Sequence, residues 1–293
     1  MTAFPETQTL PVALAAALQA GAAIMTIYDT DFQVEEKDDK SPLTEADRAA
    51  HGIISRLLAD AFPTPVLSEE AADIPHEERR RWDRFWLVDP LDGTKEFIKK
   101  NGEFTVNIAL IEQQRPVLGV VYAPARGLVY FASPETGARR ARLEGPPSES
   151  TPDRIVHEAE TLPVAAATSA LRVVASRSHC NEETQSFIAE LEQEHGTAER
   201  VSIGSSLKLC LVAEGSADVY PRIAPTMEWD TAAADAVVRA TGGTVVEHPS
   251  GAPLIYNKPD LHNPHFVVRS RAMSQRQTET PSPGAVPPPF VLL

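Results

Sequence analysis

Apolar residues recur at helical spacing twice near the start of the chain. One amphipathic segment opens at Pro11 and runs to residue 28, and a second covers residues 44–62, so both patterns predict helices. Pro63 marks the end of the second segment, because proline cannot continue a helix. Residues 29–41, between the two segments, are charged and predict an exposed loop.

Alternation of apolar and polar residues replaces the helical pattern further along the chain. Residues 104–111 and 117–122 alternate on either side of a short polar turn, which predicts a β-hairpin, and residues 128–132 predict another strand. A short apolar run at 85–88 precedes them. We expect this run to stop near Asp89, since the next residue is a proline with no N–H for a sheet. The first half therefore predicts helices packed on an antiparallel sheet.

The second half of the chain alternates between the two kinds of pattern, which is typical of a layered α/β unit. Strand patterns at 171–175, near 201, at 217–220 and at 244–247 are separated by helical patterns at 182–194, 207–212 and 231–240.

Segments of low periodicity divide the chain into parts. Residues 133–169 are rich in Glu, Pro, Ser, Thr and Ala, and we interpret them as a loop-bearing connection. We expect an N-terminal α+β unit over 1–150 and a C-terminal α/β unit over 151–271. Residues 272–293 are polar and proline-rich without periodicity, which predicts a disordered tail.

Composition limits the classes of function. The 293 residues include 27 Lys and Arg and 41 Asp and Glu, which gives a net charge of −14. This charge opposes binding to nucleic-acid polymers and anionic membranes. Two cysteines are too few for a disulfide scaffold and indicate a reducing compartment. We found no apolar run long enough for a transmembrane segment and no basic start of a signal peptide, so we expect a cytoplasmic protein.

The strongest chemical candidate is the turn that follows the apolar run at 85–88. Asp89, the carbonyl of Leu91, Asp92 and the hydroxyl of Thr94 are hard oxygen groups, which suit Mg²⁺ rather than zinc. The N–H groups around Gly93 can form a concave nest for a phosphate. An acidic turn after a core strand, without a metal, remains the alternative on this spacing alone.

Other candidates have plain structural explanations beside the functional ones. Asp47 fits a variant capping box with Thr44. Glu69 lies in a Ser-Glu-Glu segment that could equally be an ordinary solvent-exposed loop. Asp230 lies directly before a predicted helix, where aspartate commonly caps. The Gly-Ser-Ser triplet at 204–206 precedes another helix, where it either binds an anion or only caps.

Three of these motifs together resemble the signature of the inositol monophosphatase superfamily, whose members are Mg²⁺-dependent, lithium-sensitive phosphatases. They are Ser-Glu-Glu at 68–70, Asp-Pro-Leu-Asp-Gly-Thr at 89–94 and Glu-Trp-Asp-Thr-Ala-Ala at 228–233. The segments at 94–98, 101–107, 176–179 and 204–208 are similar to those of CysQ-type 3′(2′),5′-bisphosphate nucleotidases. The resemblance implies an α/β (α+β) fold of the layered αβαβα type and hydrolysis of 3′-phosphoadenosine 5′-phosphate to AMP and phosphate.

The resemblance also implies the role of each site residue. Two or three Mg²⁺ ions would be held, one by Glu69, Asp89 and the Leu91 carbonyl, and another by Asp89, Asp92 and Asp230. Thr94 would orient the attacking water, with Glu69 or Asp47 completing the proton path. The residues implied to contact the small nucleotide substrate are Gly93, Thr94, Ser176, His179, Ser205, Lys208, Arg222 and Asp230.

Alternatives remain at this point. His179 can be an ordinary polar loop residue, and Lys208 can extend its side chain over an apolar helix face towards solvent. An inositol or sugar monophosphatase would use the same metal ligands, and a non-catalytic Mg²⁺-binding scaffold is a third possibility. Peripheral association with the inner membrane is an alternative to a purely cytoplasmic location, and the sequence does not fix the oligomeric state.

Overall fold

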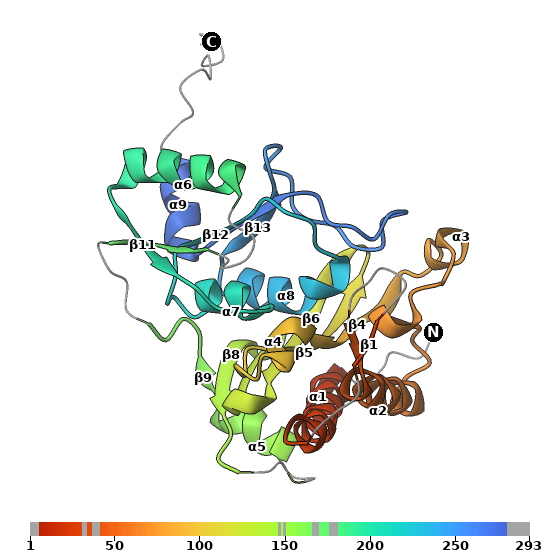
Figure 1. Ribbon diagram of the computed structural model, residues 1–293. Coiled ribbons are helices and arrows are strands. Elements are labelled where there is room, and N and C mark those ends of the chain that lie inside the picture. The colour runs from red at the N-terminus through yellow and green to blue at the C-terminus, as the bar shows by residue number, and fades with distance from the viewer. Residues whose placement is uncertain are drawn as a thin grey trace.

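The computed structural model describes residues 6–30, 34–36, 42–145, 148, 151–165, 170–175 and 181–279. Helices and sheets alternate in five layers (Figure 1): α1 and α2, a seven-stranded sheet, α7 and α8, a five-stranded sheet, and finally α6 and α9. The predicted αβαβα architecture is confirmed.

The first layer consists of α1 (Glu6–Tyr28) and α2 (Glu45–Ala61), with α5 (Thr151–Glu158) against α1. A small sheet of β1 (Val34–Glu36) and β2 (Pro42–Thr44) lies between α1 and α2, with β1 inside the predicted loop at 29–41 and β2 after it. Both predicted helices are confirmed, although α1 begins at Glu6 and includes Pro11.

One expectation about α1 is wrong. By length and composition alone, the helical segment Gln8–Tyr28 could cross a membrane. We had expected no apolar segment of that length in the chain. Half of this stretch is buried, and Leu14, Leu18 and Ile24 pack in the core between the helices and the first sheet. In the structure α1 therefore has the packing of a core helix.

The seven-stranded sheet has the strand order β3-β4-β5-β6-β7-β8-β9, and every neighbouring pair except the parallel β3 and β4 is antiparallel. The predicted hairpin is confirmed. The strands are β3 (Val66–Ser68), β4 (Arg84–Asp92), β5 (Thr105–Glu112), β6 (Arg115–Ala123), β7 (Leu128–Ser133), β8 (Gly137–Arg142) and β9 (Glu160–Thr161).

Strand β4 does not stop near Asp89 as the sequence predicts. It continues to Asp92, and its register against β5 shifts between Asp89 and Asp92. Pro90 lies inside this shift, where a missing N–H costs no ladder hydrogen bond. The bulge is what turns Asp89 and Asp92 towards the same space.

The middle layer consists of α7 (Leu207–Ala213) and α8 (Ala232–Ala240), which lie between the two sheets. Helix α8 is alanine-rich because it is covered from both sides. Gly119 on β6 allows the close approach, since a Cβ there would lie 2.1 Å from the Ala233 carbonyl oxygen. The largest core cluster fills this space between the sheets.

The five-stranded sheet has the order β11-β10-β12-β14-β13 and mixes parallel and antiparallel pairs. Helices α6 (Glu182–His195) and α9 (Arg271–Glu279) cover its outer face (Figure 1). The strands are β10 (Leu171–Val174), β11 (Ala198–Val201), β12 (Val219–Arg222), β13 (Thr244–Glu247) and β14 (Phe266–Arg269).

Two predictions for weakly periodic segments need correction. The connection at 133–169 contains β8, α5 and β9, and the first sheet extends past residue 150 to Thr161. The expected disorder from residue 272 is wrong for 272–279, because α9 forms there and buries Met273 under the second sheet. Residues 280–293 lie outside the described part.

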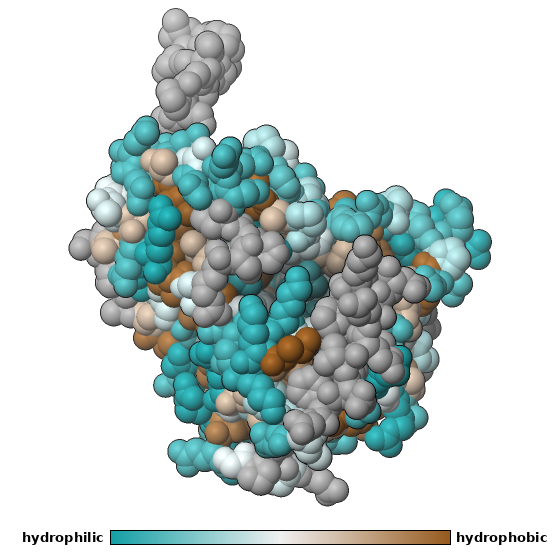
Figure 2. Space-filling model, in the orientation of Figure 1, coloured by the Kyte–Doolittle hydropathy of each residue, from teal (hydrophilic) through white to brown (hydrophobic). Residues whose placement is uncertain are grey.

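Short helical turns complete the fold, and several of them border the candidate site. They are η1 (Glu69–Ala71), α3 (His76–Arg79), α4 (Thr94–Ile98), η2 (Pro124–Arg126) and η3 (Glu228–Asp230). On the face seen in Figure 2, hydrophilic residues predominate among the residues that are coloured.

Candidate active site

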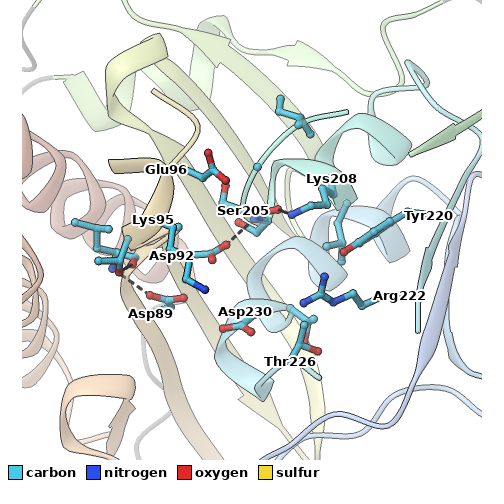
Figure 3. A pocket seen from close by; sticks show the side chains of 18 of the residues that line it. Asp89, Asp92, Lys95, Glu96, Ser205, Lys208, Tyr220, Arg222, Thr226 and Asp230 are labelled. Atoms are coloured by element: carbon cyan, nitrogen blue, oxygen red, sulfur yellow. Dashed lines mark hydrogen bonds between the residues drawn. The ribbon is translucent and has the colours of Figure 1, made fainter. Parts of the chain in front are cut away.

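A cavity of about 540 Å³ opens between the end of β4, the loop before α7, and η3. Its size is typical of a site for a small molecule. Figure 3 shows Asp89, Asp92 and Asp230 on one side of it, together with Lys95, and the cations of Lys208 and Arg222 on the other. The cavity therefore has an anionic end and a cationic end.

The anionic end contains three carboxylates from two distant parts of the chain. Oxygen atoms of Asp89, Asp92 and Asp230 all lie within 4.8 Å of one another. Asp89 is only 1% exposed, and its Oδ1 accepts a hydrogen bond of 3.0 Å from the Leu91 N–H. The sequence-predicted metal ligands Asp89, Asp92 and Asp230 are thus brought together.

Burial and mutual repulsion make this cluster unfavourable when all three groups are ionised. Burial raises the pKa of Asp89 well above its usual range, and the charges of Glu69, Asp92 and Asp230 raise it further. Burial, followed by the charge of Asp92, raises the pKa of Asp230 to about 8. A divalent cation would remove the repulsion, and an all-oxygen set suits Mg²⁺, so these residues fit the metal implied by the sequence.

Glu69 and Asp47 border the same cluster. Glu69 begins η1 and lines the cavity, and Asp47 is fully buried in the first turn of α2. The negative charge of each contributes to the raised pKa of Asp89, which places both near the candidate metal site. The Thr44 side chain lies outside the described part, so the capping box with Asp47 stays a prediction.

The turn after β4 closes the anionic end. Gly93 has a φ of 90°, in the left-handed region that favours glycine, and it precedes α4. The hydroxyl of Thr94, the first residue of α4, donates to the Leu91 carbonyl at 3.5 Å. Leu91, Gly93 and Thr94 all line the cavity.

Of the two alternatives for the 204–206 loop, anion binding is not available to the N–H groups of Gly204 and Ser206. The Gly204 N–H donates to Glu103 Oε2 at 2.8 Å, and the Ser206 N–H donates to Asp92 Oδ2 at 2.6 Å. Two N–H groups of the loop are therefore already bound to carboxylates of the protein. Ser205 lines the cavity, and its buried hydroxyl has no hydrogen-bond partner within the described chain.

Lys208 and Arg222 form the cationic end. The Lys208 ammonium donates to the Ser205 carbonyl at 2.9 Å and lies 6.0 Å from the centre of the Tyr220 ring. Burial lowers the pKa of Lys208, whereas the nearby charge of Asp92 raises it. Arg222 donates from Nη2 to the Pro225 carbonyl, and its Nε has no hydrogen-bond partner among the described residues. Both cations retain donors for an anionic ligand.

For three candidate residues, the structure does not show the contact that the sequence suggested. Ser176 and His179 lie outside the described residues, so their substrate contacts stay predictions. Asp230 does not cap α8 as the sequence suggested. Its Oδ2 accepts from the Met227 N–H at 2.9 Å, and Thr231 occupies the position before the helix.

Sequence reasoning missed several residues at the site. Lys95, Tyr220 and Thr226 line the cavity, and Asn107 lies next to Asp92 and accepts a hydrogen bond from the Ser206 hydroxyl. Asn107 carried a signal, because it is a polar residue within a strand whose other positions are mostly apolar. The others became recognisable only once the two halves of the chain were placed together.

Comparison with known proteins identifies the family. The sequence model of the inositol monophosphatase family matches residues 6–280. The 3′(2′),5′-bisphosphate nucleotidase CysQ of Salmonella typhimurium is 46% identical over 266 residues, which cover 86% of this chain and 96% of that protein. The chain therefore belongs to the inositol monophosphatase family.

Solved structures agree with this assignment. The crystal structure of CysQ from Bacteroides thetaiotaomicron matches with a TM-score of 0.79 and 50% identity, covering 89% of this chain and 96% of that one. The suhB protein from Bartonella henselae matches with a TM-score of 0.68 at 24% identity, over 93% of this chain and 98% of that one. The second match supports the fold alone.

Proposed function

We propose that this protein is a Mg²⁺-dependent 3′(2′),5′-bisphosphate nucleotidase that releases the 3′-phosphate of 3′-phosphoadenosine 5′-phosphate and leaves AMP. The observation that carries the proposal is the cavity with two ends of opposite charge. The carboxylates of Asp89, Asp92 and Asp230 suit a metal-bound reacting phosphate, and Lys208 and Arg222 suit a second phosphate. The names of the curated relatives support the same activity.

The metal ligands in this proposal are Glu69, Asp89, the Leu91 carbonyl, Asp92 and Asp230, with Asp89 shared between two ions and a third ion as an option. Bound Mg²⁺ would neutralise the phosphate oxygens and make a water molecule more acidic. The carboxylates supply the negative charge that retains the cations, and their clustering supports this assignment.

The remaining residues bind, orient and move a proton. Thr94 would hold the attacking water through its hydroxyl, and Glu69 or Asp47 would accept its proton. The turn at Gly93 would approach the reacting phosphate closely. The residues proposed to surround the adenosine and its 5′-phosphate are Ser176, His179, Ser205, Lys208 and Arg222.

The anionic and cationic ends of the cavity come from different parts of the chain, which supports separate roles for these parts. Residues 1–150 would supply most of the metal site, and residues 151–271 would supply most of the substrate contacts together with Asp230. We place the enzyme in the cytoplasm, in sulfur assimilation and nucleotide recycling, and the free, buried thiol of Cys210 fits a reducing compartment.

A substrate panel tests the proposal. Phosphate release from 3′-phosphoadenosine 5′-phosphate, 3′-AMP and inositol 1-phosphate would be measured with Mg²⁺ and again with EDTA. We expect the bisphosphate to give the highest kcat/KM and EDTA to stop turnover. A preference for inositol 1-phosphate would favour the sugar-phosphatase alternative, and no release from any ester would favour a non-catalytic scaffold.

A further inference from the structure

Ser206 lies where the two halves of the active site meet. It immediately precedes α7, in the middle layer, and its neighbours lie on the first sheet. Across β4 and β5, Asp92 pairs with Thr105 and Asp89 pairs with Asn107, with the β4 bulge between the two pairs. Thr105 and Asn107 are thus the cross-strand partners of two candidate metal ligands.

Three hydrogen bonds converge on Ser206. Its N–H donates to Asp92 Oδ2 at 2.6 Å, and its hydroxyl donates to Asn107 Oδ1 at 2.7 Å. The hydroxyl oxygen also lies 2.8 Å from Thr105 Oγ1. Because the single proton of Ser206 Oγ is given to Asn107, Thr105 must donate to Ser206.

This orientation leaves the other side of the Asn107 amide for Asp92. The Nδ2 group is buried with no hydrogen-bond partner by geometry in the described chain, and Asp92 lies on this side of the amide. A reversed amide would direct its oxygen to the same carboxylate, which is unfavourable. The Ser206 N–H and the Asn107 amide group therefore both face the Asp92 carboxylate.

The arrangement is rigid and shielded from water. Thr105 is fully buried, Asn107 is 1% exposed and Ser206 is 2% exposed. Hydrogen bonds in such surroundings are strong, and a partner left unsatisfied is costly. Since the Ser206 N–H binds Oδ2 of Asp92, the carboxylate cannot turn freely.

We propose that Ser206 is a positioning residue for metal binding, held by Thr105 and Asn107, and that it fixes which oxygen of Asp92 faces the cation. The inference rests on the proposed function in taking Mg²⁺ as the cation. The same contacts hold the 204–206 loop, so Ser205 and Lys208 keep their places relative to the carboxylates. The bonding of Ser206 thereby couples the anionic end of the cavity to the cationic end.

The test is Mg²⁺ binding measured by isothermal titration calorimetry on the full, metal-stripped chain. We expect Ser206→Ala and Thr105→Val to weaken the Mg²⁺ Kd by about tenfold, because each removes a hydrogen bond of the Ser206 hydroxyl that holds the Ser206 N–H in place against Asp92. Thr105→Ser keeps the hydroxyl and should bind like wild type. The matched control Ser202→Ala removes an exposed hydroxyl from the same loop and should change nothing.

Contrary outcomes are equally definite. Wild-type Mg²⁺ affinity in Ser206→Ala, with a lower melting temperature, would show that the residue only stabilises the fold and would overturn the inference. If Ser206→Ala does not fold by circular dichroism, Thr105→Val against Thr105→Ser decides, and equal affinities overturn it. Binding is measured without substrate, so a wild type that binds Mg²⁺ but prefers inositol 1-phosphate contradicts the proposed function alone.

Discussion

Asp92 and Lys208 face each other across the candidate active site, and each changes the pKa of the other. Burial raises the pKa of Asp92, and the nearby Lys208 ammonium opposes this rise. Burial lowers the pKa of Lys208, and the Asp92 carboxylate opposes that decrease. The pair joins the metal end of the cavity to the end proposed for a second phosphate (Figure 3).

Lys208→Ala should lower kcat/KM for 3′-phosphoadenosine 5′-phosphate more than for 3′-AMP. Losing a charge-assisted hydrogen bond costs about 1.5–3 kcal/mol, or roughly 10- to 150-fold, and 3′-AMP has no 5′-phosphate to lose. Steady-state kinetics on both substrates measure the difference. Arg115→Ala, which removes an exposed cation at the β5–β6 turn, is the control. An equal decrease for both substrates would contradict a role in 5′-phosphate binding.

Asp92→Asn should abolish turnover while leaving the fold intact. The change removes a charge from the cluster with Asp89 and Asp230, and a lost catalytic metal costs on the order of 100-fold or more. Phosphate release and circular dichroism check the two parts. The exposed Asp60→Asn serves as the control, and activity of Asp92→Asn within about tenfold of wild type would refute the metal assignment.

The metal-free protein should lose stability as the pH rises from about 4 to 8. Folding raises the pKa of Asp230 from its ordinary value of 3.8 to about 8, so the folded state holds more protons than the unfolded state in this window. Mg²⁺ replaces those protons and should raise the melting temperature more at pH 8 than at pH 6. Thermal melts with EDTA and with Mg²⁺ test this.

Asp230→Asn provides the comparison for that experiment. The variant lacks the titrating carboxyl, so its EDTA melts should depend less on pH than those of wild type. An identical pH dependence in the two proteins would show that ionisation of Asp230 does not control stability.

Asp235→Ala should destabilise the fold without touching the cavity. Asp235 is fully buried on α8, receives hydrogen bonds from Arg239 at 2.6 and 3.0 Å, and receives another from the Tyr256 hydroxyl at 2.8 Å. Removing one partner of such a pair costs about 3–5 kcal/mol. Urea unfolding measures the change, with the exposed Glu190→Ala on α6 as control. A decrease of less than about 1 kcal/mol in the free energy of unfolding would show that the hydrogen bonds of Asp235 do not stabilise the fold.

Much of the fold could be predicted because helical and strand periodicities are local. The segments that escaped prediction have polar sequences. Strand β8 reads Gly-Ala-Arg-Arg-Ala-Arg and lies near the edge of the first sheet, so few of its side chains need to be apolar. Helix α9 is also polar, and it forms by packing Met273 against the second sheet. Tertiary contacts, not local pattern, determine these elements.

The candidate site, like the fold, could be predicted only in part from the sequence. The chemistry of Asp89, Asp92 and Asp230 is visible in the sequence, but their convergence depends on the β4 bulge and on η3. The sequence left anion binding and capping open for residues 204–206, because it could not show that Glu103 and Asp92, from the other half of the chain, accept the N–H groups of Gly204 and Ser206. No local pattern reveals partners so far apart in sequence.

The central claim is that the carboxylate end of the cavity cleaves the 3′-phosphate while the cationic end holds the 5′-phosphate. The most direct measurement is ³¹P NMR of the products formed from 3′-phosphoadenosine 5′-phosphate by the wild-type enzyme with Mg²⁺. We expect the spectrum to show inorganic phosphate and 5′-AMP in equal amounts. Accumulation of 3′-AMP, or no hydrolysis while inositol 1-phosphate is cleaved, would contradict it.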